Sequence, residues 1–343
     1  MDLEVVYCDP GGVGYHPVLH MARLAADLLE ARLTTVPTSS PGRARKILAL
    51  LPRTRGNTDC LLICPSPSHL ASLTMIDGWR RSYGNLIAWV FDSFWPEMIP
   101  AFARMRCPFD RVFVTEREDL GTWRRTLRAP VDWLPWGADV LRLGSGAPER
   151  PVDLVRVGRQ PPGWDDDATT RISVEARGLC FEGRPRSWAD ASDNERQLVQ
   201  TFSRSKYTLS STNLVSPSVQ THPTREYLTA RWTDALAAGA TVAGIPPRSE
   251  TVQELLWPEA LLDLRTTKID EALDILVADV RRWNPARAAL NHARALERLD
   301  WRWRFLELAQ AFSRKTPTLD RELAELRVPD AGTRERAFPS GPS

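Results

Sequence analysis

The chain opens with a pattern that strongly limits its fold: a short apolar strand, a glycine loop and a helix. Residues 3–8 are apolar, residues 9–14 read Asp-Pro-Gly-Gly-Val-Gly, and residues 16–32 have helical periodicity. Residues 61–64, 86–91 and 111–115 are further short apolar segments, each followed by loop residues and a helical stretch. This alternation predicts parallel strands joined by right-handed crossovers, as in a doubly wound α/β sheet.

The second half of the chain repeats this organisation after a turn-rich segment. Residues 143–151 lack periodicity and predict a linker, and new strands are expected at 153–157, 178–181, 207–210 and 240–243. Helices are expected at 250–255, 269–283 and 286–314. We therefore predict an α/β protein with two Rossmann-like doubly wound domains, residues 1–142 and 152–300, facing each other across a cleft. Helices in 301–328 are expected to pack back on the first domain, and residues 329–343 to form a disordered tail.

Composition excludes several classes of function. The 343 residues include 45 basic and 43 acidic side chains, a formal net charge of +2, which gives no overall attraction to nucleic acid or anionic membrane. No apolar run approaches the ~20 residues that span a bilayer, and the N-terminus does not resemble a secretion signal, so a cytoplasmic protein without a transmembrane segment is expected. The five cysteines lack zinc-site spacing, and we predict reduced thiols and no metal site. The loop Asp165 to Asp167 is expected to be solvated, with a cation or a basic partner as the alternative.

Residues 225–247 place charges and glycines around a helix-to-strand junction. Residues 227–238 have helical spacing, and Arg231 and Asp234 lie three apart on one side of the helix. Gly239 is in the usual position to end the helix before the strand at 240–243.

Four segments resemble motifs of GT-B glycosyltransferases of the "group 1" kind, in the order of that family. They are 11–16 (GGVGYH), 131–139 (VDWLPWGAD), 157–159 (VGR) and 231–239 (RWTDALAAG). The resemblance covers most of residues 1–315. It implies transfer of a sugar from a nucleoside diphosphate sugar to a small-molecule or glycan acceptor, with a retaining mechanism and no metal or other cofactor. The oligomeric state is not implied.

The resemblance also implies roles for individual residues around the leaving diphosphate. Arg159 is the first candidate to stabilise its developing charge, and Arg231 either reaches the phosphates or pairs with Asp234. Arg225 either faces the cleft or forms a solvated salt bridge, and Lys206 could replace a lysine that the family carries after its Gly-Arg. Asp234 is expected to accept from ribose hydroxyls. The complete predicted donor site is Gly12, Gly14, Lys206, Arg225, Arg231, Asp234 and Gly239.

Two further residues are candidates for catalysis on the acceptor side. Asp92 follows an apolar strand, where its carboxylate could orient or deprotonate a hydroxyl, or could instead cap a helix over 96–105. His16 follows the glycine loop and is either structural or a contact to the substrates. Glu116 and His222 are weaker candidates for substrate contacts, with capping and surface roles as their alternatives.

Two other functions remain open at this point. A nucleotide-sugar 2-epimerase shares the two-domain cleft but needs more carboxylates and histidines than the five histidines here provide. A non-catalytic GT-B subunit would bind a nucleotide sugar or a partner enzyme.

Overall fold

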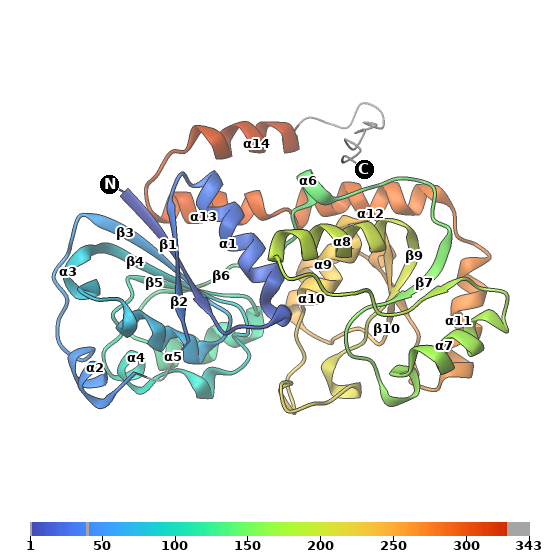
Figure 1. Cartoon of the computed structure of the whole chain (residues 1–343), viewed down its shortest axis with the longest axis horizontal. Coiled ribbons are helices and arrows are strands. Elements are labelled where there is room, and N and C mark those ends of the chain that lie inside the picture. The colour runs from blue at the N-terminus through green and yellow to red at the C-terminus, as the bar shows by residue number, and fades with distance from the viewer. Residues whose placement is uncertain (1, 39–40, 328–343) are drawn as a thin grey trace.

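The computed structural model describes residues 2–38 and 41–327, which form two α/β domains side by side (Figure 1). The predicted tail, residues 329–343, lies outside the described residues. The prediction of two doubly wound parallel-sheet domains is confirmed. Within the described residues, no helix is long and apolar enough to cross a membrane.

The first domain contains a six-stranded, all-parallel sheet in the order β2-β1-β3-β4-β5-β6. Its strands are β1 (Asp2–Asp9), β2 (Arg32–Pro37), β3 (Thr58–Cys64), β4 (Tyr83–Val90), β5 (Arg111–Val114) and β6 (Val131–Trp133). The sequence did not reveal β2, because this edge strand is only partly buried and alternates with polar residues.

Short helices connect these strands. They are α1 (His16–Leu28), α2 (Arg43–Leu48), α3 (Trp79–Ser82), α4 (Ala101–Met105), α5 (Leu120–Thr126) and α6 (Val140–Leu143), with 3-10 turns η1 (Val13–Tyr15), η2 (Pro67–Met75), η3 (Pro96–Met98) and η4 (Arg117–Asp119). The single helix expected over 96–105 is therefore split. Pro100 lies between η3 and α4 with an extended backbone, and it lacks the N–H that a continuous helix needs.

The second domain contains a five-stranded parallel sheet in the order β11-β10-β9-β7-β8. Its strands are β7 (Val152–Arg156), β8 (Phe181–Glu182), β9 (Ser205–Leu209), β10 (Thr241–Gly244) and β11 (Leu261–Asp263). Its helices are α7 (Asp167–Glu175), α8 (Ala191–Ser203), α9 (Ala230–Ala237), α10 (Glu250–Leu255), α11 (Ile269–Val280) and α12 (Pro285–Arg298), with turns η5 (Pro162–Trp164), η6 (Asn213–Val215) and η7 (Pro258–Ala260).

The long helix predicted over 286–314 is wrong, because the chain breaks at Leu299 and Asp300. Helix α12 ends at Arg298, and α13 (Trp301–Ala311) starts after Asp300. The Asp300 carboxylate accepts from the backbone N–H of Arg302 and from that of Leu141 in α6, each at 2.8 Å. Asp300 also forms a parallel bridge with Ala138. One aspartate thus caps two helices and joins the end of the chain to the first domain.

After this break the chain returns to the first domain. Helices α13 and α14 (Pro317–Arg327) lie against α1, as Figure 1 shows. Arg314 donates to the carbonyl of Leu29 at 3.2 Å, and the Thr318 hydroxyl donates to Glu30 at 3.0 Å.

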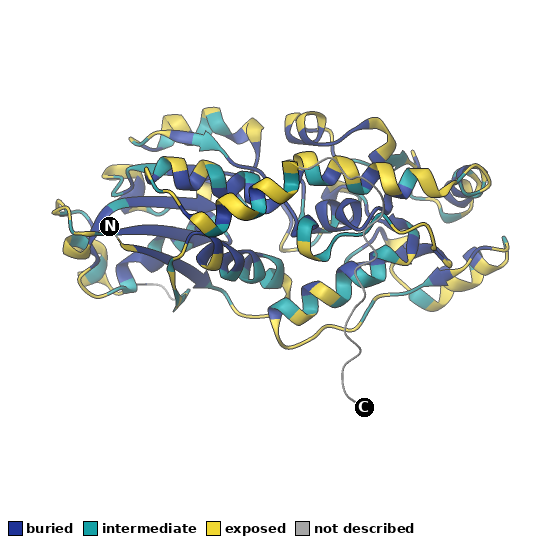
Figure 2. Ribbon diagram, turned by 90° about the horizontal axis from the view of Figure 1, so that it is seen from above, coloured by how far each residue is buried: buried dark blue, intermediate teal, exposed yellow. Residues whose placement is uncertain are grey.

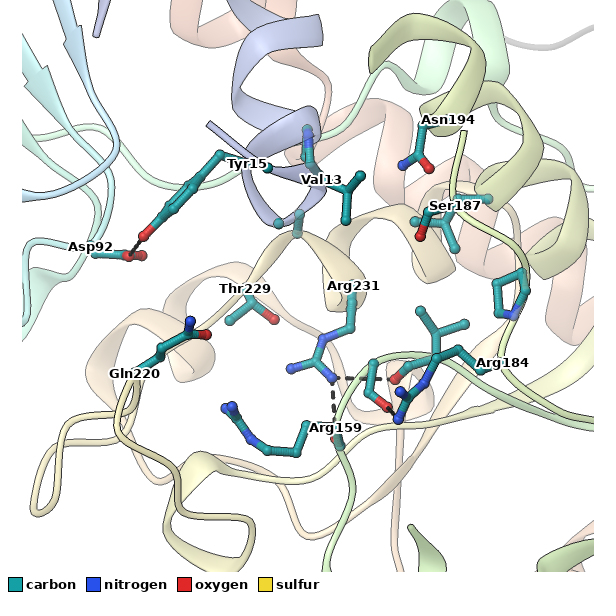
Figure 3. A pocket seen from close by; sticks show the side chains of 18 of the residues that line it. Val13, Tyr15, Asp92, Arg159, Arg184, Ser187, Asn194, Gln220, Thr229 and Arg231 are labelled. Atoms are coloured by element: carbon teal, nitrogen blue, oxygen red, sulfur yellow. Dashed lines mark hydrogen bonds between the residues drawn. The ribbon is translucent and has the colours of Figure 1, made fainter. Parts of the chain in front are cut away.

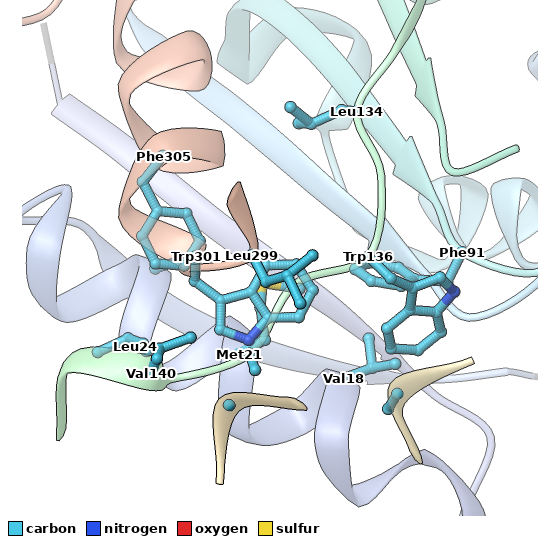
Figure 4. Packing of buried hydrophobic residues seen from close by; sticks show 14 of the residues in the cluster. Val18, Met21, Leu24, Phe91, Leu134, Trp136, Val140, Leu299, Trp301 and Phe305 are labelled. Atoms are coloured by element: carbon cyan, nitrogen blue, oxygen red, sulfur yellow. The ribbon is translucent and has the colours of Figure 1, made fainter. Parts of the chain in front are cut away.

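The largest hydrophobic core is shared by both domains. It combines Met21 and Leu24 of α1, Trp89 of β4, Trp232 of α9 and Trp301 of α13 in one cluster. Figure 4 shows Trp136, Phe91, Trp301 and Phe305 packed beside α1. Figure 2 shows buried strands beneath helices with exposed outer faces. Two further clusters fill the other face of each sheet, and the shared cluster fixes the domains relative to each other.

Candidate functional site

A cavity of ≈ 660 Å³ lies between the two domains. In each sheet the first strand of the domain lies between the second and the third, so the strand order reverses there. Ligands of doubly wound proteins bind outside the carboxyl ends of the strands at this point. The loops that follow β1 and β7 both line the cavity, which therefore lies at both switch points.

Its lining residues come from both domains. The first domain contributes Gly11, Gly12, Val13, Gly14, Tyr15, Pro17, Asp92, Phe94 and Trp136. The second contributes Val157, Gly158, Arg159, Arg184, Pro185, Arg186, Ser187, Asn194, Leu198, Gln220, Tyr227, Thr229, Ala230 and Arg231.

The glycine loop after β1 leaves open space for a ligand. Gly11 and Gly12 have φ of 76° and 79°, a conformation that L-residues with a side chain rarely adopt. A Cβ atom added at Gly12 or Gly14 would meet no atom within 4 Å. The predicted placement of Gly12 and Gly14 at the cleft therefore agrees with the structure, and the exposed backbone can approach a ligand closely.

Two arginines of the second domain form the positive wall of the cavity (Figure 3). Arg231 donates to the carbonyls of Val157 and Arg159 at 3.2 and 3.3 Å, and it does not pair with Asp234. Arg159 is held by the carbonyl of Ser216 at 2.8 Å and by the hydroxyl of Ser218 at 2.7 Å. Among the residues that the structure describes, neither guanidinium forms an ion pair with a carboxylate.

The charge of Arg231 has no carboxylate partner among the residues that the structure describes. Removal from water, together with repulsion from Arg159 and Arg184, lowers the pKa of Arg231 to about 10. Arg184 adds a third guanidinium at the cavity wall, tethered to Asp165 at 3.5 Å. A desolvated cation without a carboxylate partner is costly, and a bound anion would remove that cost.

Gly158 sets the position of Arg231. Its φ is 72°, and an added Cβ would lie 2.9 Å from the Cζ atom of Arg231. The Val157-Gly158-Arg159 segment is thus a turn that both supplies one arginine and makes room for the other.

On the opposite wall, Asp92 and Tyr15 form a polar pair. The Tyr15 hydroxyl donates to the Asp92 carboxylate at 3.1 Å (Figure 3). Burial raises the pKa of Asp92 to about 7, and the hydrogen bond from Tyr15 partly opposes this shift. Burial and the Asp92 charge also raise the pKa of Tyr15, so the phenol stays protonated. Asp92 does not cap a helix, because η3 begins only at Pro96 and has no side-chain cap.

Two aromatic rings join the domains at this wall. Phe94 and Tyr227 stack with ring centroids 3.6 Å apart and planes 5° apart. Both line the cavity, so the stacked pair presents apolar surface beside the polar groups.

Three residues predicted to belong to the site do not line the cavity. Lys206 pairs with Asp153 at 2.6 Å and lies over the Trp283 ring, away from the cavity, because it lies near the amino end of β9 whereas the cavity lies at the carboxyl ends of the strands. Arg225 pairs with Asp119 of the first domain at 2.7 Å and lines a smaller neighbouring cavity of ≈ 260 Å³. His16 begins α1 beside the cavity without lining it, and its Nδ1 atom is buried without a hydrogen-bond partner.

Asp234 and Gly239 also lie away from the cavity. Asp234 is buried where α9 packs on α8, next to Glu195, and burial together with the Glu195 charge raises the pKa of Asp234 well above its usual range. Its position in the helix directs it to the helix interface rather than to a ribose. Gly239 ends α9 with φ of 79°, and an added Cβ would lie 2.7 Å from the carbonyl oxygens of Ser145 and Ala288, so it serves chain packing.

The two weaker candidates, His222 and Glu116, each form a contact between the two domains. His222 contacts Glu97 at 3.3 Å, and its Nδ1 accepts from the backbone N–H of Arg225 at 3.0 Å. Glu116 is buried and accepts from the backbone N–H of Leu228 at 3.3 Å.

The acidic loop is held by arginine side chains. Asp165 pairs with buried Arg156 at 2.6 Å, Asp167 also pairs with Arg156, and Asp166 caps α7. In the parts of the chain that the structure describes, no group of three or more His, Cys, Asp or Glu side chains could hold a metal ion.

Sequence reasoning missed several lining residues. Tyr15 and Phe94 are adjacent to predicted motifs, and their positions next to a glycine loop and a strand end could have indicated them. Arg184 and Arg186 lie in a loop without a readable signature. Gln220 comes from an irregular segment whose path only tertiary contacts define, and Thr229 precedes α9, which begins at Ala230 and not at residue 227 as predicted.

Comparison with known proteins adds evidence on the second domain. Residues 150–310 match a family model described as "Glycosyl transferase-like". The matched region supplies Arg159, Arg184 and Arg231, and with the first domain it forms the two doubly wound domains on either side of a cleft expected from the sequence.

The whole chain is similar to several solved glycosyltransferase structures. A UDP-forming alpha,alpha-trehalose-phosphate synthase from Burkholderia xenovorans shares 12% identity, with 96% of this chain and 99% of that chain covered and a TM-score of 0.49. CalG4, the calicheamicin glycosyltransferase, shares 13% identity, with coverage of 92% and 100% and a TM-score of 0.41. Phytolacca americana UGT2 shares 11% identity, with coverage of 95% and 99% and a TM-score of 0.41. No curated protein matches the chain.

Proposed function

We propose that the protein is a glycosyltransferase that moves a sugar from a nucleoside diphosphate sugar to a hydroxyl acceptor. The observation that carries the proposal is the pair Arg159 and Arg231, two guanidinium groups at the wall of the interdomain cavity that pair with no carboxylate of residues 2–38 or 41–327. The glycosyl transferase-like domain that supplies them supports the assignment.

The proposed chemistry follows from this charge distribution. Cleavage of the bond between the anomeric carbon and the phosphate builds negative charge on the diphosphate. Arg159 and Arg231, already oriented by backbone and hydroxyl acceptors, stabilise that charge without reorganising. We propose a retaining reaction without a metal, in which the leaving phosphate accepts the proton of the acceptor hydroxyl. Asp92 and Tyr15 then orient the acceptor from the opposite wall.

A panel of UDP-, GDP- and TDP-sugars tests the proposal. We expect transfer to an acceptor, or slow hydrolysis, with one donor class. Epimer formation would instead support an epimerase, and a thermal shift without turnover would support a non-catalytic subunit.

Substitution of Arg159 by alanine tests the site itself. Loss of one charge-stabilising donor is expected to lower kcat by about 10²-fold to 10³-fold. The matched control is Arg196→Ala, because Arg196 is an exposed arginine that pairs with Asp193 in α8, away from the cavity. Unchanged turnover in Arg159→Ala would remove this residue from the site.

A further inference from the structure

One face of the first domain exposes large apolar side chains among cations. Ile47, Leu48, Leu51 and Met105 are 65%, 50%, 47% and 64% exposed. The exposed cations Arg43, Lys46 and Arg104 lie on the same two helices, α2 and α4. We call these seven residues the basic apolar patch.

Two hydrogen bonds from arginine side chains to backbone carbonyls join the segment after α2 to the segment after α4. The Arg106 side chain, next to Met105, donates to the carbonyl of Leu50 at 3.3 Å. Arg53 donates to the carbonyl of Pro108 at 2.9 Å. Figure 1 shows α2 and α4 near each other at the same end of the first domain, and the four apolar side chains of these two segments are exposed.

The charge of this region differs sharply from that of the whole chain. Residues 43–55 contain five basic residues and no acidic one, although the net charge of the protein is only +2. Asp77 and Asp110, the neighbouring carboxylates, are engaged by Arg45 and Arg53. Within the described part of the chain, no ion pair joins Arg43, Lys46 or Arg104 to a carboxylate. The patch is therefore locally cationic.

We propose that the basic apolar patch binds the surface of an anionic lipid bilayer. Basic side chains are attracted to anionic headgroups, while exposed aliphatic side chains enter the boundary between headgroups and acyl chains. A second copy of the chain is a poor occupant, because two such patches would repel each other. Nucleic acid would satisfy the cations but leave four aliphatic side chains without a partner.

Vesicle flotation with the full-length protein tests this proposal. We expect binding to vesicles of phosphatidylcholine mixed with phosphatidylglycerol, little binding to phosphatidylcholine alone, and weaker binding as salt is raised. The double variant Arg43→Glu/Lys46→Glu should weaken partitioning by at least about fivefold per residue. Ile47→Asp/Leu48→Asp should weaken it by about tenfold or more, since burial of such side chains drives insertion.

Matched substitutions on the second domain serve as controls. Ile172 is 71% exposed on α7, and Arg281 and Arg298 are exposed near the ends of α11 and α12. Ile172→Asp and Arg281→Glu/Arg298→Glu should bind vesicles like the wild type, and all variants should keep its melting temperature.

Three results would overturn the proposal. The first is no binding to the mixed vesicles. The second is equal loss in the patch variants and in the controls. The third is binding to polyuridine or polyglutamate as strong as that to vesicles and insensitive to Ile47→Asp/Leu48→Asp, which would indicate a general polyanion site.

Discussion

At the scale of single residues, Arg231 combines a stability cost with its proposed role. The guanidinium is desolvated, and no carboxylate in the described part of the chain pairs with it, so Arg231→Leu should raise thermal stability while it lowers kcat/KM by about 10²-fold or more. Thermal melting and steady-state kinetics on the same preparation check both effects. Lower stability in the variant would show that the two carbonyl contacts of Arg231 outweigh its desolvation.

Asp92 gives the site an expected pH dependence. Its pKa is raised to about 7, so the carboxylate needed to orient an acceptor is present above that pH and is lost below it. We expect kcat/KM to fall as pH drops through about 7, and Asp92→Asn to remove this inflection. Because the Tyr15 hydrogen bond lowers the pKa of Asp92, Tyr15→Phe should move the inflection to higher pH. An unchanged profile in Asp92→Asn would assign the inflection to another group.

Some of these residues could be predicted from the sequence because their position at the end of a strand determines where they lie. Gly12, Asp92 and Arg159 follow strand ends, and the carboxyl ends of parallel strands meet at one edge of a sheet. Asp234 was placed incorrectly because helical periodicity gives only relative orientation. The packing of α8 on α9, which the local sequence does not contain, decides that the carboxylate faces Glu195.

At the scale of elements, the turn after β7 couples backbone conformation to the arginine wall. In Gly158→Ala the new methyl group meets both an unfavourable φ and the Arg231 side chain. Gly178→Ala is a matched control, because Gly178 has φ of 74° but nothing within 4 Å of an added Cβ. Both variants should lose about 1 kcal/mol of unfolding free energy, and only Gly158→Ala should also lose donor binding.

Denaturant unfolding and a donor titration separate the two effects. Equal donor affinity in both alanine variants would show that Arg231 adjusts without loss of function.

The break between α12 and α13 marks the limit of prediction at this scale. Residues 286–314 have helical periodicity on both sides of Asp300, so a single helix was the natural interpretation. At this break Asp300 pairs with Ala138, which lies 162 residues earlier in the chain, and local sequence does not encode that contact.

At the scale of the whole molecule, a buried ion cluster holds the domains together. Arg302 of α13 is fully buried and pairs with Asp139 at 2.7 Å, with Asp300 at 3.1 Å and with Glu322 of α14 at 2.6 Å. Removing the cation leaves buried carboxylates uncompensated. Arg302→Ala should therefore lower the unfolding free energy by about 3–5 kcal/mol.

Urea unfolding measures this loss, and Arg142→Ala is its control. Arg142 pairs with the same Glu322 but is partly exposed, so its removal should cost about 0–1 kcal/mol. Similar losses in the two variants would show that the buried pairs of Arg302 contribute no more stability than the exposed pair of Arg142.

The return of the chain to its starting domain has a consequence for biosynthesis. The inner face of α1 packs against Trp301 and Phe305, which a ribosome adds only after the entire second domain. Until then, Met21, Leu24 and their neighbours are covered by the first sheet but not by α13. During synthesis the first domain is therefore incompletely folded and prone to self-association until α13 and α14 have been made and pack against it.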